Sequence, residues 1–421
     1  MAKVFSAQTQ KAQFTPLTFD PVYGYSQVRS EQPNRPTSME RATRFWLNVV
    51  GIALIVTMTM LIIAQQLLNR DLITENEQLR ESLSYRSRPG AIEARKTAEA
   101  HPLFDRYSDD FETFKARFEK SYETPEEEHR RMVVFLNRMA EIDQLNDDIG
   151  AVEASTEFGP NEFADMTDEE IQKLLLPIDY YRRLHESATF IQPQGDTVSE
   201  TAVKPPPRLD WREKGVVTAV KAQGKCGSCW AFATAATVES AYAVAHGELR
   251  NLSEQELLDC NLANNACNGG DLDKSFQFVH ENGLVAEDAY PYVAHRQNTC
   301  SAASAGETTK IDVAYWLNPS EDAMIDWLVN YGPVNVGIAV PPSMMQYKGG
   351  VFKPTDYDCK FKVLGLHALL VVGYGETDEG EKYWIVKNSW GQKWGTENGY
   401  VYFARGVNAC GIEDEAIGIL A

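Results

Sequence analysis

The first 225 residues of this 421-residue chain contain no cysteine. All seven cysteines lie in the C-terminal half: Cys226, Cys229, Cys260, Cys267, Cys300, Cys359 and Cys410. Six of them can pair and one is left over, which favours an oxidising compartment, three disulfides and one free thiol. A set of buried free cysteines in a cytosolic protein is the alternative that the count alone leaves open.

Positive charge is also scarce, since 40 Lys and Arg face 60 Asp and Glu and give a formal net charge of -20. Nucleic acid is therefore excluded as a partner, because its phosphates require a basic surface. Hydrophobic residues make up 43% of the chain, which argues against global disorder. The length suggests two or three domains.

Residues 45–64 lack any charge, and twenty helical residues span ~30 Å, the thickness of a bilayer core. A cleavable signal peptide is the weaker alternative, because the run begins late and a cut after Ala64 would place Ile62 where a small residue is required. Arginines are more frequent before the run than after it: Arg29, Arg35, Arg41 and Arg44 against Arg70 and Arg80. This bias predicts a type II orientation, with residues 1–44 as a cytosolic tail and 45–68 as a signal anchor.

Composition divides the remaining chain into three parts. Residues 69–104 are predicted to form a stalk. In residues 105–204, apolar residues recur every three to four positions and predict helices, followed by a linker that ends at Pro205-Pro206-Pro207. Residues 205–421 are rich in Gly, Trp and β-forming runs such as HALLVVGYG, which predicts a separate domain.

The string QGKCGSCWAF places Cys229 at the start of an Ala-rich helical run. Unpaired backbone N–H groups at a helix N-terminus stabilise a thiolate, the reactive form of cysteine. A redox or zinc pair formed by Cys226 and Cys229 is the alternative, but no second C-x-x-C or ligand-spaced histidine pair accompanies it, so we predict no metal.

His367 precedes the apolar run ALLVV, where a single histidine is more often structural than catalytic. The wider constellation changes that interpretation. His367 lies 138 residues after Cys229, and Asn388 lies 21 residues further on, in the string NSWG. The Asn388 amide oxygen could orient the imidazole, and Trp390 could shield that hydrogen bond from water.

These motifs, together with DWREKGVVTAVK, SEQELLDC at 253–260 and CNGG at 267–270, resemble the papain/cathepsin L family of cysteine proteases over residues 105–421. The resemblance implies an α+β fold, with a helical domain, a β-barrel-like domain and the active-site cleft between them. It implies a cysteine endopeptidase without a cofactor, acting through an acyl-thioester. Cys229 would be the nucleophile, His367 the general base and acid, and Asn388 the orienting residue. Gln223 would complete an oxyanion hole with the Cys229 N–H.

The same resemblance implies the disulfides Cys226–Cys267, Cys260–Cys300 and Cys359–Cys410, leaving Cys229 free. Gly269 and Gly270 would lie beside the substrate backbone, with Trp390 also at the substrate site. The pocket for the residue one before the cleaved position would be formed by Leu272, Gly337, Ala368 and Glu415. Glu415 could accept a basic side chain there, or it could face solvent. Leu366 departs from the Asp or Asn that many relatives place before the histidine.

Upstream, two pro-segment motifs are matched. Glu127, Arg131, Phe135, Ile142 and Asn146 fit the first motif, in which Arg138 replaces an Asn, and Gly159, Asn161, Phe163 and Asp165 fit the second. An amphipathic core helix is the alternative interpretation of the first set. The resemblance implies an inhibitory pro-segment that acid releases by cleavage near residues 190–205.

The whole arrangement resembles the membrane-anchored cathepsin L and falcipain-type enzymes of protozoan parasites. It implies a secretory precursor, a monomeric mature enzyme in a lysosome-like acidic compartment, peptide substrates, and cystatin-like inhibitors among the admissible partners. Asn251 begins a glycosylation sequon, although Ser253 with Glu256 is better explained as a capping box. A catalytically silent papain-like scaffold is the rival function, and the presence of all four catalytic positions argues against it.

Overall fold

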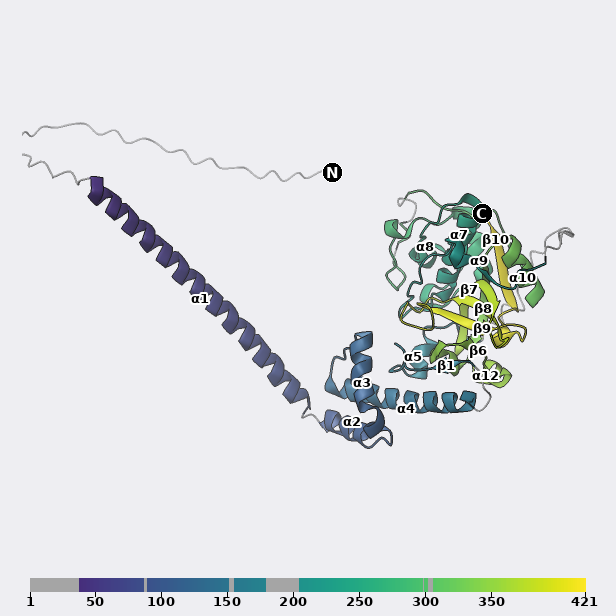
Figure 1. The fold of residues 1–421 in the computed structure, drawn as a ribbon, viewed down its shortest axis with the longest axis horizontal. Helices are drawn as coiled ribbons and strands as arrows, with labels where there is room; N and C mark the ends of the chain where they lie inside the picture. Colours follow the sequence, from purple (N-terminus) through teal and green to yellow (C-terminus); the bar gives the residue numbers. More distant parts are fainter. Residues whose placement is uncertain (1–37, 87–88, 151–154, 179–203, 298, 302–305) are drawn as a thin grey trace, which may run out of the picture. The chain divides into compact units, whose positions relative to one another are not determined.

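A computed structural model describes the chain in six stretches: residues 38–86, 89–150, 155–178, 204–297, 299–301 and 306–421 (Figure 1). The chain divides into two compact units, Met1–Leu79 and Arg80–Ala421. The predicted tail up to residue 37, and most of the predicted linker with its maturation region, lie outside the described residues.

The first unit is dominated by one continuous helix, α1 (Ser38–Arg86). Within it, Phe45–Thr74 is long and apolar enough to cross a membrane, by length and composition only. The helix begins inside the predicted tail and passes residue 68 without a break, because many of the residues that follow, such as Glu, Gln, Arg and Leu, are good helix formers.

The pro-segment side of the second unit contains the helices α2 (Pro89–Glu99), α3 (Phe104–Phe118), α4 (Pro125–Gly150) and α5 (Asp168–Gln172), with the short strand β1 (Glu157–Phe158). Phe111, Phe114 and Phe135 are buried against one another, with ring centroids 5.0–6.1 Å apart. This core holds α3 across α4, as the phenylalanine spacing predicts. Helix α2 packs against α4 and buries Ala91 and Ala98, so the packed pro-segment begins before residue 105 and includes part of the predicted stalk.

Both predicted pro-segment motifs make tertiary contacts. Arg131 donates to Glu127 at 2.7 Å on its own helix and to Glu170 at 2.6 Å on α5. Asn146 bonds both the N–H and the C=O of Phe158, each at 3.1 Å, and thereby fixes β1 beside α4. The first motif is therefore more than an amphipathic core helix, since its polar members join α4 to later parts of the pro-segment.

The catalytic side contains six α-helices and four short 3₁₀ turns among the described residues. They are α7 (Cys229–His246), α8 (Glu254–Cys260), α9 (Leu272–Asn282), α10 (Glu321–Asn330), α11 (Pro342–Met345) and α12 (Asp356–Phe361), with η1 (Trp211–Lys214), η2 (Ala266–Asn268), η3 (Glu287–Ala289) and η5 (Ala409–Gly411).

Its strands are β2 (Leu209–Asp210), β3 (Val313–Trp316), β4 (Val334–Val340), β5 (Tyr347–Gly349), β6 (Val351–Phe352), β7 (Gly365–Glu376), β8 (Lys382–Lys387), β9 (Tyr400–Ala404) and β10 (Glu415–Leu420). The main sheet has the order β3-β10-β4-β7-β8-β9-β6, and β2 pairs with β7. Strand β1 of the pro-segment pairs antiparallel with β5, so the pro-segment extends a catalytic-domain strand pair. In Figure 1, α5 and β1 lie beside this end of the sheet.

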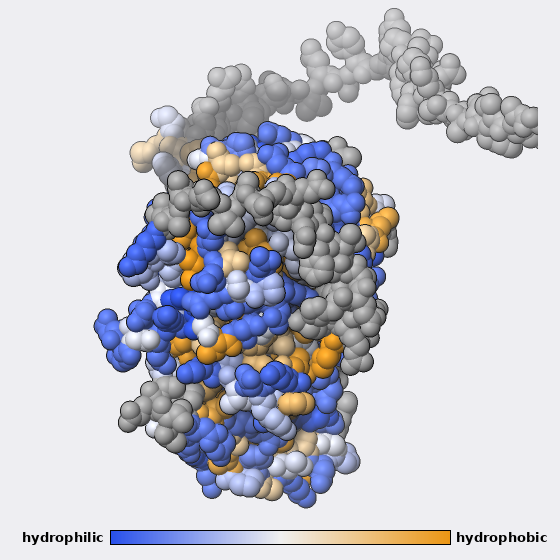
Figure 2. All heavy atoms as spheres, turned by 90° about the vertical axis from the view of Figure 1, so that its right-hand side faces the viewer, coloured by the Kyte–Doolittle hydropathy of each residue, from blue (hydrophilic) through white to orange (hydrophobic). Residues whose placement is uncertain are grey.

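Two large hydrophobic cores lie on the catalytic side, in addition to a smaller third cluster that includes Leu370 and Ile385. One surrounds α7 and includes Cys229 and Trp230, whereas the other fills the sheet and includes Trp384 and Trp390. The sheet-side core continues into the pro-segment through Phe158 and Ile171. These two cores confirm the predicted division into a helical part and a β-rich part. On the face drawn in Figure 2, apolar side chains lie in small groups among hydrophilic ones.

Candidate active site

Cys229 is the first residue of α7 and is fully buried. Ser228 stands at the N-cap, but its hydroxyl bonds the Tyr292 hydroxyl at 2.6 Å and does not cap the helix. Backbone N–H groups of Ala368, Trp230 and Cys229 interact with the sulfur and favour its charged form. Burial outweighs them and raises the pKa of the Cys229 thiol to about 11. The sequence predicts a stabilised thiolate, yet in this covered site the thiol is protonated.

His367 lies on β7, fully within the interior. Its Nε2 is 2.7 Å from Oδ1 of Asn388, and its ring stacks on Trp390 with centroids 4.6 Å apart. Burial lowers the pKa of His367 to about 4, and Nδ1 has no hydrogen-bond partner among the described residues. A neutral imidazole that donates from Nε2 leaves the Nδ1 lone pair available for a proton.

Gln223 is buried between the two parts of the catalytic side. Its Oε1 accepts from Ser389 Oγ at 2.7 Å, which fixes the orientation of the amide. Its Nε2 donates to the Cys226 carbonyl at 2.8 Å and to the Leu174 carbonyl at 2.9 Å. Leu174 belongs to the pro-segment, so the pro-segment occupies the amide group that the sequence assigns to an oxyanion hole.

The pro-segment covers the site with Leu174, Leu175 and Leu176, all buried. Leu176 and Leu366 exchange two backbone hydrogen bonds of 2.8 Å, as in an antiparallel strand pair, immediately before His367. Glycine makes this approach possible. A Cβ at Gly365 would lie 2.6 Å from Leu175 Cβ, and one at Gly269 would lie 2.8 Å from Leu176 Cδ2. Gly365 was not among the predicted site residues, although a glycine two residues before a candidate histidine is a usable signal.

The four predicted pocket residues line one cavity, together with Leu176 and Trp316. We call it the specificity pocket. Sheet register explains the grouping, because Ala368 pairs with Gly337 and Gly337 pairs with Glu415, which places the three on one face of the sheet. Trp316 was not predicted, since its position depends on how β3 pairs with β10.

Glu415 lines the specificity pocket and is only 9% exposed, so the alternative in which it faces solvent is wrong. A Cβ at Gly337 would lie 2.5 Å from its Oε2, so the carboxylate extends over the glycine. Burial, with a smaller contribution from the nearby carboxylates of Asp414, Asp271 and Asp273, raises the pKa of Glu415 to about 7. Gly270 must also lack a side chain, because a Cβ there would lie 2.5 Å from the Trp230 ring.

Three disulfides join the pairs that the family resemblance implies: Cys226–Cys267, Cys260–Cys300 and Cys359–Cys410. Cys229 is the free cysteine. Asn251 of the sequon is exposed. Ser253 caps α8 by accepting from the Glu256 N–H at 3.1 Å, but the Glu256 carboxylate accepts from the Val285 N–H instead, so the predicted reciprocal capping box is wrong.

Residues 205–420 match the model of the papain family cysteine protease, and residues 111–171 match the cathepsin propeptide inhibitor domain. The chain belongs to the papain family of cysteine proteases. It is a cathepsin L-like zymogen that carries its own propeptide domain.

Relatives with this organisation cover most of the chain. Procathepsin L of Mus musculus is 37% identical over 76% of this chain and 94% of its own length. Cathepsin F of Drosophila melanogaster is 38% identical over 76% of this chain, which spans about half (52%) of that longer relative. The structure of digestive procathepsin L 3 from Tenebrio molitor larval midgut has a TM-score of 0.65 at 33% identity, covering 75% of this chain and 99% of its own.

Proposed function

We propose that this zymogen gives a cysteine endopeptidase in which Cys229 is the nucleophile and His367 its general base and acid. The observation that carries the proposal is the 2.7 Å hydrogen bond between His367 and Asn388, with Trp390 stacked on the His367 ring. The Cys229 sulfur lies beside the backbone N–H of Ala368, the residue that follows His367. This is the arrangement of nucleophile, base and orienting group that acyl transfer requires.

The mechanism follows from these positions. The thiol proton passes to Nδ1 of His367, and the sulfur attacks the peptide carbonyl to form a tetrahedral oxyanion. Nε2 of Gln223 and the Cys229 N–H donate to that oxygen, a contribution on the order of 10²–10³ in rate for one donor. His367 then protonates the leaving amine, and water activated by the same imidazole releases the acyl group.

The proton distribution should differ between zymogen and enzyme. Burial keeps thiol and imidazole neutral in the covered site. Release of Leu174–Leu176 would hydrate the cleft, which lowers the pKa of Cys229 and raises that of His367. The thiolate–imidazolium pair then becomes accessible, with the first-turn N–H groups of α7 favouring the sulfur anion.

The test uses the full-length chain after acid treatment, with a fluorogenic peptide and a thiol-reactive epoxide. Cys229→Ala should abolish hydrolysis and labelling, and His367→Ala should lower turnover by several orders of magnitude. His280→Ala is the matched control, because that ring bonds the Ile311 carbonyl outside the site. Turnover by a clean Cys229→Ala protein would refute the assignment of Cys229 as the nucleophile. A parent protein that neither hydrolyses the peptide nor takes up the epoxide would favour the catalytically silent scaffold.

We further propose that Glu415 gives the specificity pocket a preference for basic side chains. No described residue supplies a cation to this buried carboxylate, so a substrate Arg would find an unneutralised partner. Glu415→Gln should lower kcat/KM for Arg at the residue one before the cleaved position and leave Leu substrates nearly unchanged. Because burial raises the pKa of the carboxyl, Arg preference should increase from pH 5 to pH 7.5 in the parent and stay flat in Glu415→Gln.

The last part of the proposal is anchoring through Phe45–Thr74 in a type II orientation, with the mature enzyme in an acidic, lysosome-like compartment. Support comes from the length and apolar composition of α1, and from the arginine bias around it. Full-length protein should resist alkaline extraction from membranes. A chain in which six apolar residues of 52–63 are replaced by Ser or Gln should be extracted, and extraction of both proteins would refute the anchor.

A further inference from the structure

Trp316 lines two cavities at once. One is the specificity pocket, and the other is a groove between α9 and β3 that includes Asp273, Phe276, His280 and Ile417. Among the described residues that line these cavities, Trp316 is the one that both share. Its side chain therefore separates the pocket from a groove that opens to solvent.

Strand register explains why an aromatic ring lies there. Trp316, the last residue of β3, pairs with Ile417 of β10, and Ile417 lies two residues beyond Glu415 on the same face. Trp316 is thus a diagonal neighbour of Glu415, a distance that a long aromatic side chain spans. The preceding residue, Tyr315, points to the opposite face and packs on Trp327 with centroids 5.7 Å apart.

The surroundings of Trp316 on the pocket side are apolar. It packs against the same hydrophobic core as Leu272, Ala368 and Leu176, a pro-segment residue that also lines the pocket. The absence of a side chain at Gly337 leaves room for the Glu415 carboxylate in the pocket, and Trp316 lines the same pocket beyond it.

We propose that Trp316 is a specificity-determining residue that forms the end wall of the specificity pocket and limits the length of the side chain it admits. The proposal rests on the proposed function, since it concerns the same substrate position. Removing the indole would connect the pocket with the α9–β3 groove, and side chains longer than leucine or phenylalanine would then extend past Glu415 toward Asp273.

The experiment uses acid-activated full-length protein and peptides that differ only at the residue one before the cleaved position: Leu, Phe and 4-phenyl-phenylalanine. In Trp316→Ala, the ratio of kcat/KM for the biphenyl peptide to that for the Leu peptide should rise at least tenfold. Trp316→Phe should raise it less. Tyr331→Ala is the matched control, because this half-exposed ring stacks on Trp327 and lines neither cavity, and the ratio should not change.

A uniform loss on all three peptides, or an unchanged ratio, would overturn the proposal and leave Trp316 with a packing role only. If Trp316→Ala does not fold, the ratio in Trp316→Phe decides the question in the same way. Failure of the proposed function is distinguishable, because the parent protein would then neither hydrolyse the Leu peptide nor take up the epoxide label at Cys229.

Discussion

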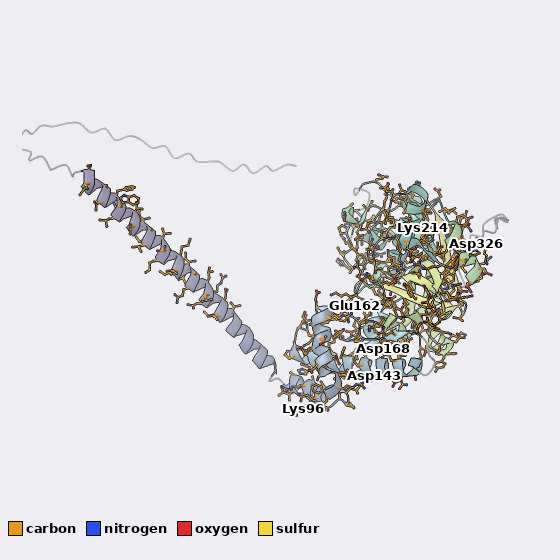
Figure 3. The ribbon with its side chains drawn as sticks, viewed as in Figure 1. Lys96, Asp143, Glu162, Asp168, Lys214 and Asp326 are labelled. Atoms are coloured by element: carbon orange, nitrogen blue, oxygen red, sulfur yellow. A yellow bond between two sulfur atoms is a disulfide. The ribbon has the colours of Figure 1, made fainter. Side chains whose placement is uncertain are left out.

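Replacing Arg138 with Ala should weaken the docking of the pro-segment. Arg138 stands where the family motif has Asn, and its side chain is only 6% exposed. It donates to Glu141 at 2.6 Å and to Asp168 at 2.9 Å. With the Gln346 amide oriented so that its oxygen faces the guanidinium, Oε1 accepts at 3.0 Å and 3.2 Å. Gln346 precedes β5 in the catalytic domain, so Arg138 joins α4 to both α5 and the catalytic domain. Asp168, one of the partners of Arg138, is labelled in Figure 3.

The magnitude follows from the exposure of each partner. Glu141 and Asp168 are 52% and 50% exposed, so water replaces the guanidinium easily and each pair contributes about 0–1 kcal/mol. Gln346 is buried, and an unpaired buried amide costs about 1–3 kcal/mol. The sum is about 1–5 kcal/mol, and its midpoint of about 3 kcal/mol corresponds to a roughly 160-fold larger population of undocked pro-segment.

The full-length zymogen is incubated at pH 5, and its conversion to the shorter enzyme is followed by gel electrophoresis. If cleavage acts on the undocked state, the rate of conversion measures the undocked population. Arg130→Ala is the matched control. Arg130 is 55% exposed, and its ion-pair partners among the described residues, Glu126 and Glu127, lie on its own helix. This variant should convert within about fivefold of the parent rate. Gln346→Ala should accelerate conversion, and the double variant Arg138→Ala/Gln346→Ala should add little. Equal rates for Arg138→Ala and Arg130→Ala would refute the reasoning.

Four further outcomes are expected. The Arg131 guanidinium lowers the pKa of Glu170. The stabilisation from this pair is therefore present at neutral pH and is lost as pH falls through the lowered pKa. Glu170→Gln should convert faster than the parent at neutral pH, and its conversion rate should increase less on acidification. Burial raises the pKa of Glu162 to about 7, so its ionised form destabilises the docked pro-segment, which is the opposite effect to that of Glu170. Glu162→Gln should therefore slow conversion at pH 7.5, where the carboxyl is ionised, and leave it unchanged at pH 4. Asn388→Ala should retain partial activity, with a larger loss in kcat than in KM, because the amide orients the imidazole. Asn251→Gln should reduce the mass of the secreted chain by one glycan if the sequon is used, and an unchanged mass would show that it is not.

The elements that carry the proposed catalytic residues were predictable because their signals are local. The helix after Cys229 follows from an Ala-rich run, and the strand that carries His367 follows from a continuous apolar run. The pairing of the six other cysteines came only from the family resemblance, since spacing alone leaves the connectivity open.

Contacts between distant segments were not predictable from local pattern. Trp316 enters the specificity pocket only because β3 pairs with β10, and the sequence carries no signal for that register. Arg138 appeared as the loss of a motif Asn, whereas in the fold its longer side chain reaches Gln346, more than two hundred residues later. Ser253 illustrates the boundary between the two cases: its local cap was predicted correctly, but the Glu256 side chain makes a tertiary contact with Val285.

The protonation of the site depends on tertiary burial in the same way. A helix N-terminus favours the Cys229 thiolate, yet the neutral form prevails while the pro-segment excludes water, because the desolvation of an anion outweighs a few N–H dipoles. The pro-segment therefore inhibits in two ways that share one cause. It contacts groups that the proposed function assigns to the substrate, through the Leu174 carbonyl on Gln223 and Leu176 at the edge of the specificity pocket, and it keeps the thiol of Cys229, the proposed nucleophile, uncharged. Loosening of the charge pairs that hold α4 to α5 would reverse both effects together, because the same leucines that leave the cleft are those that exclude water from Cys229 and His367.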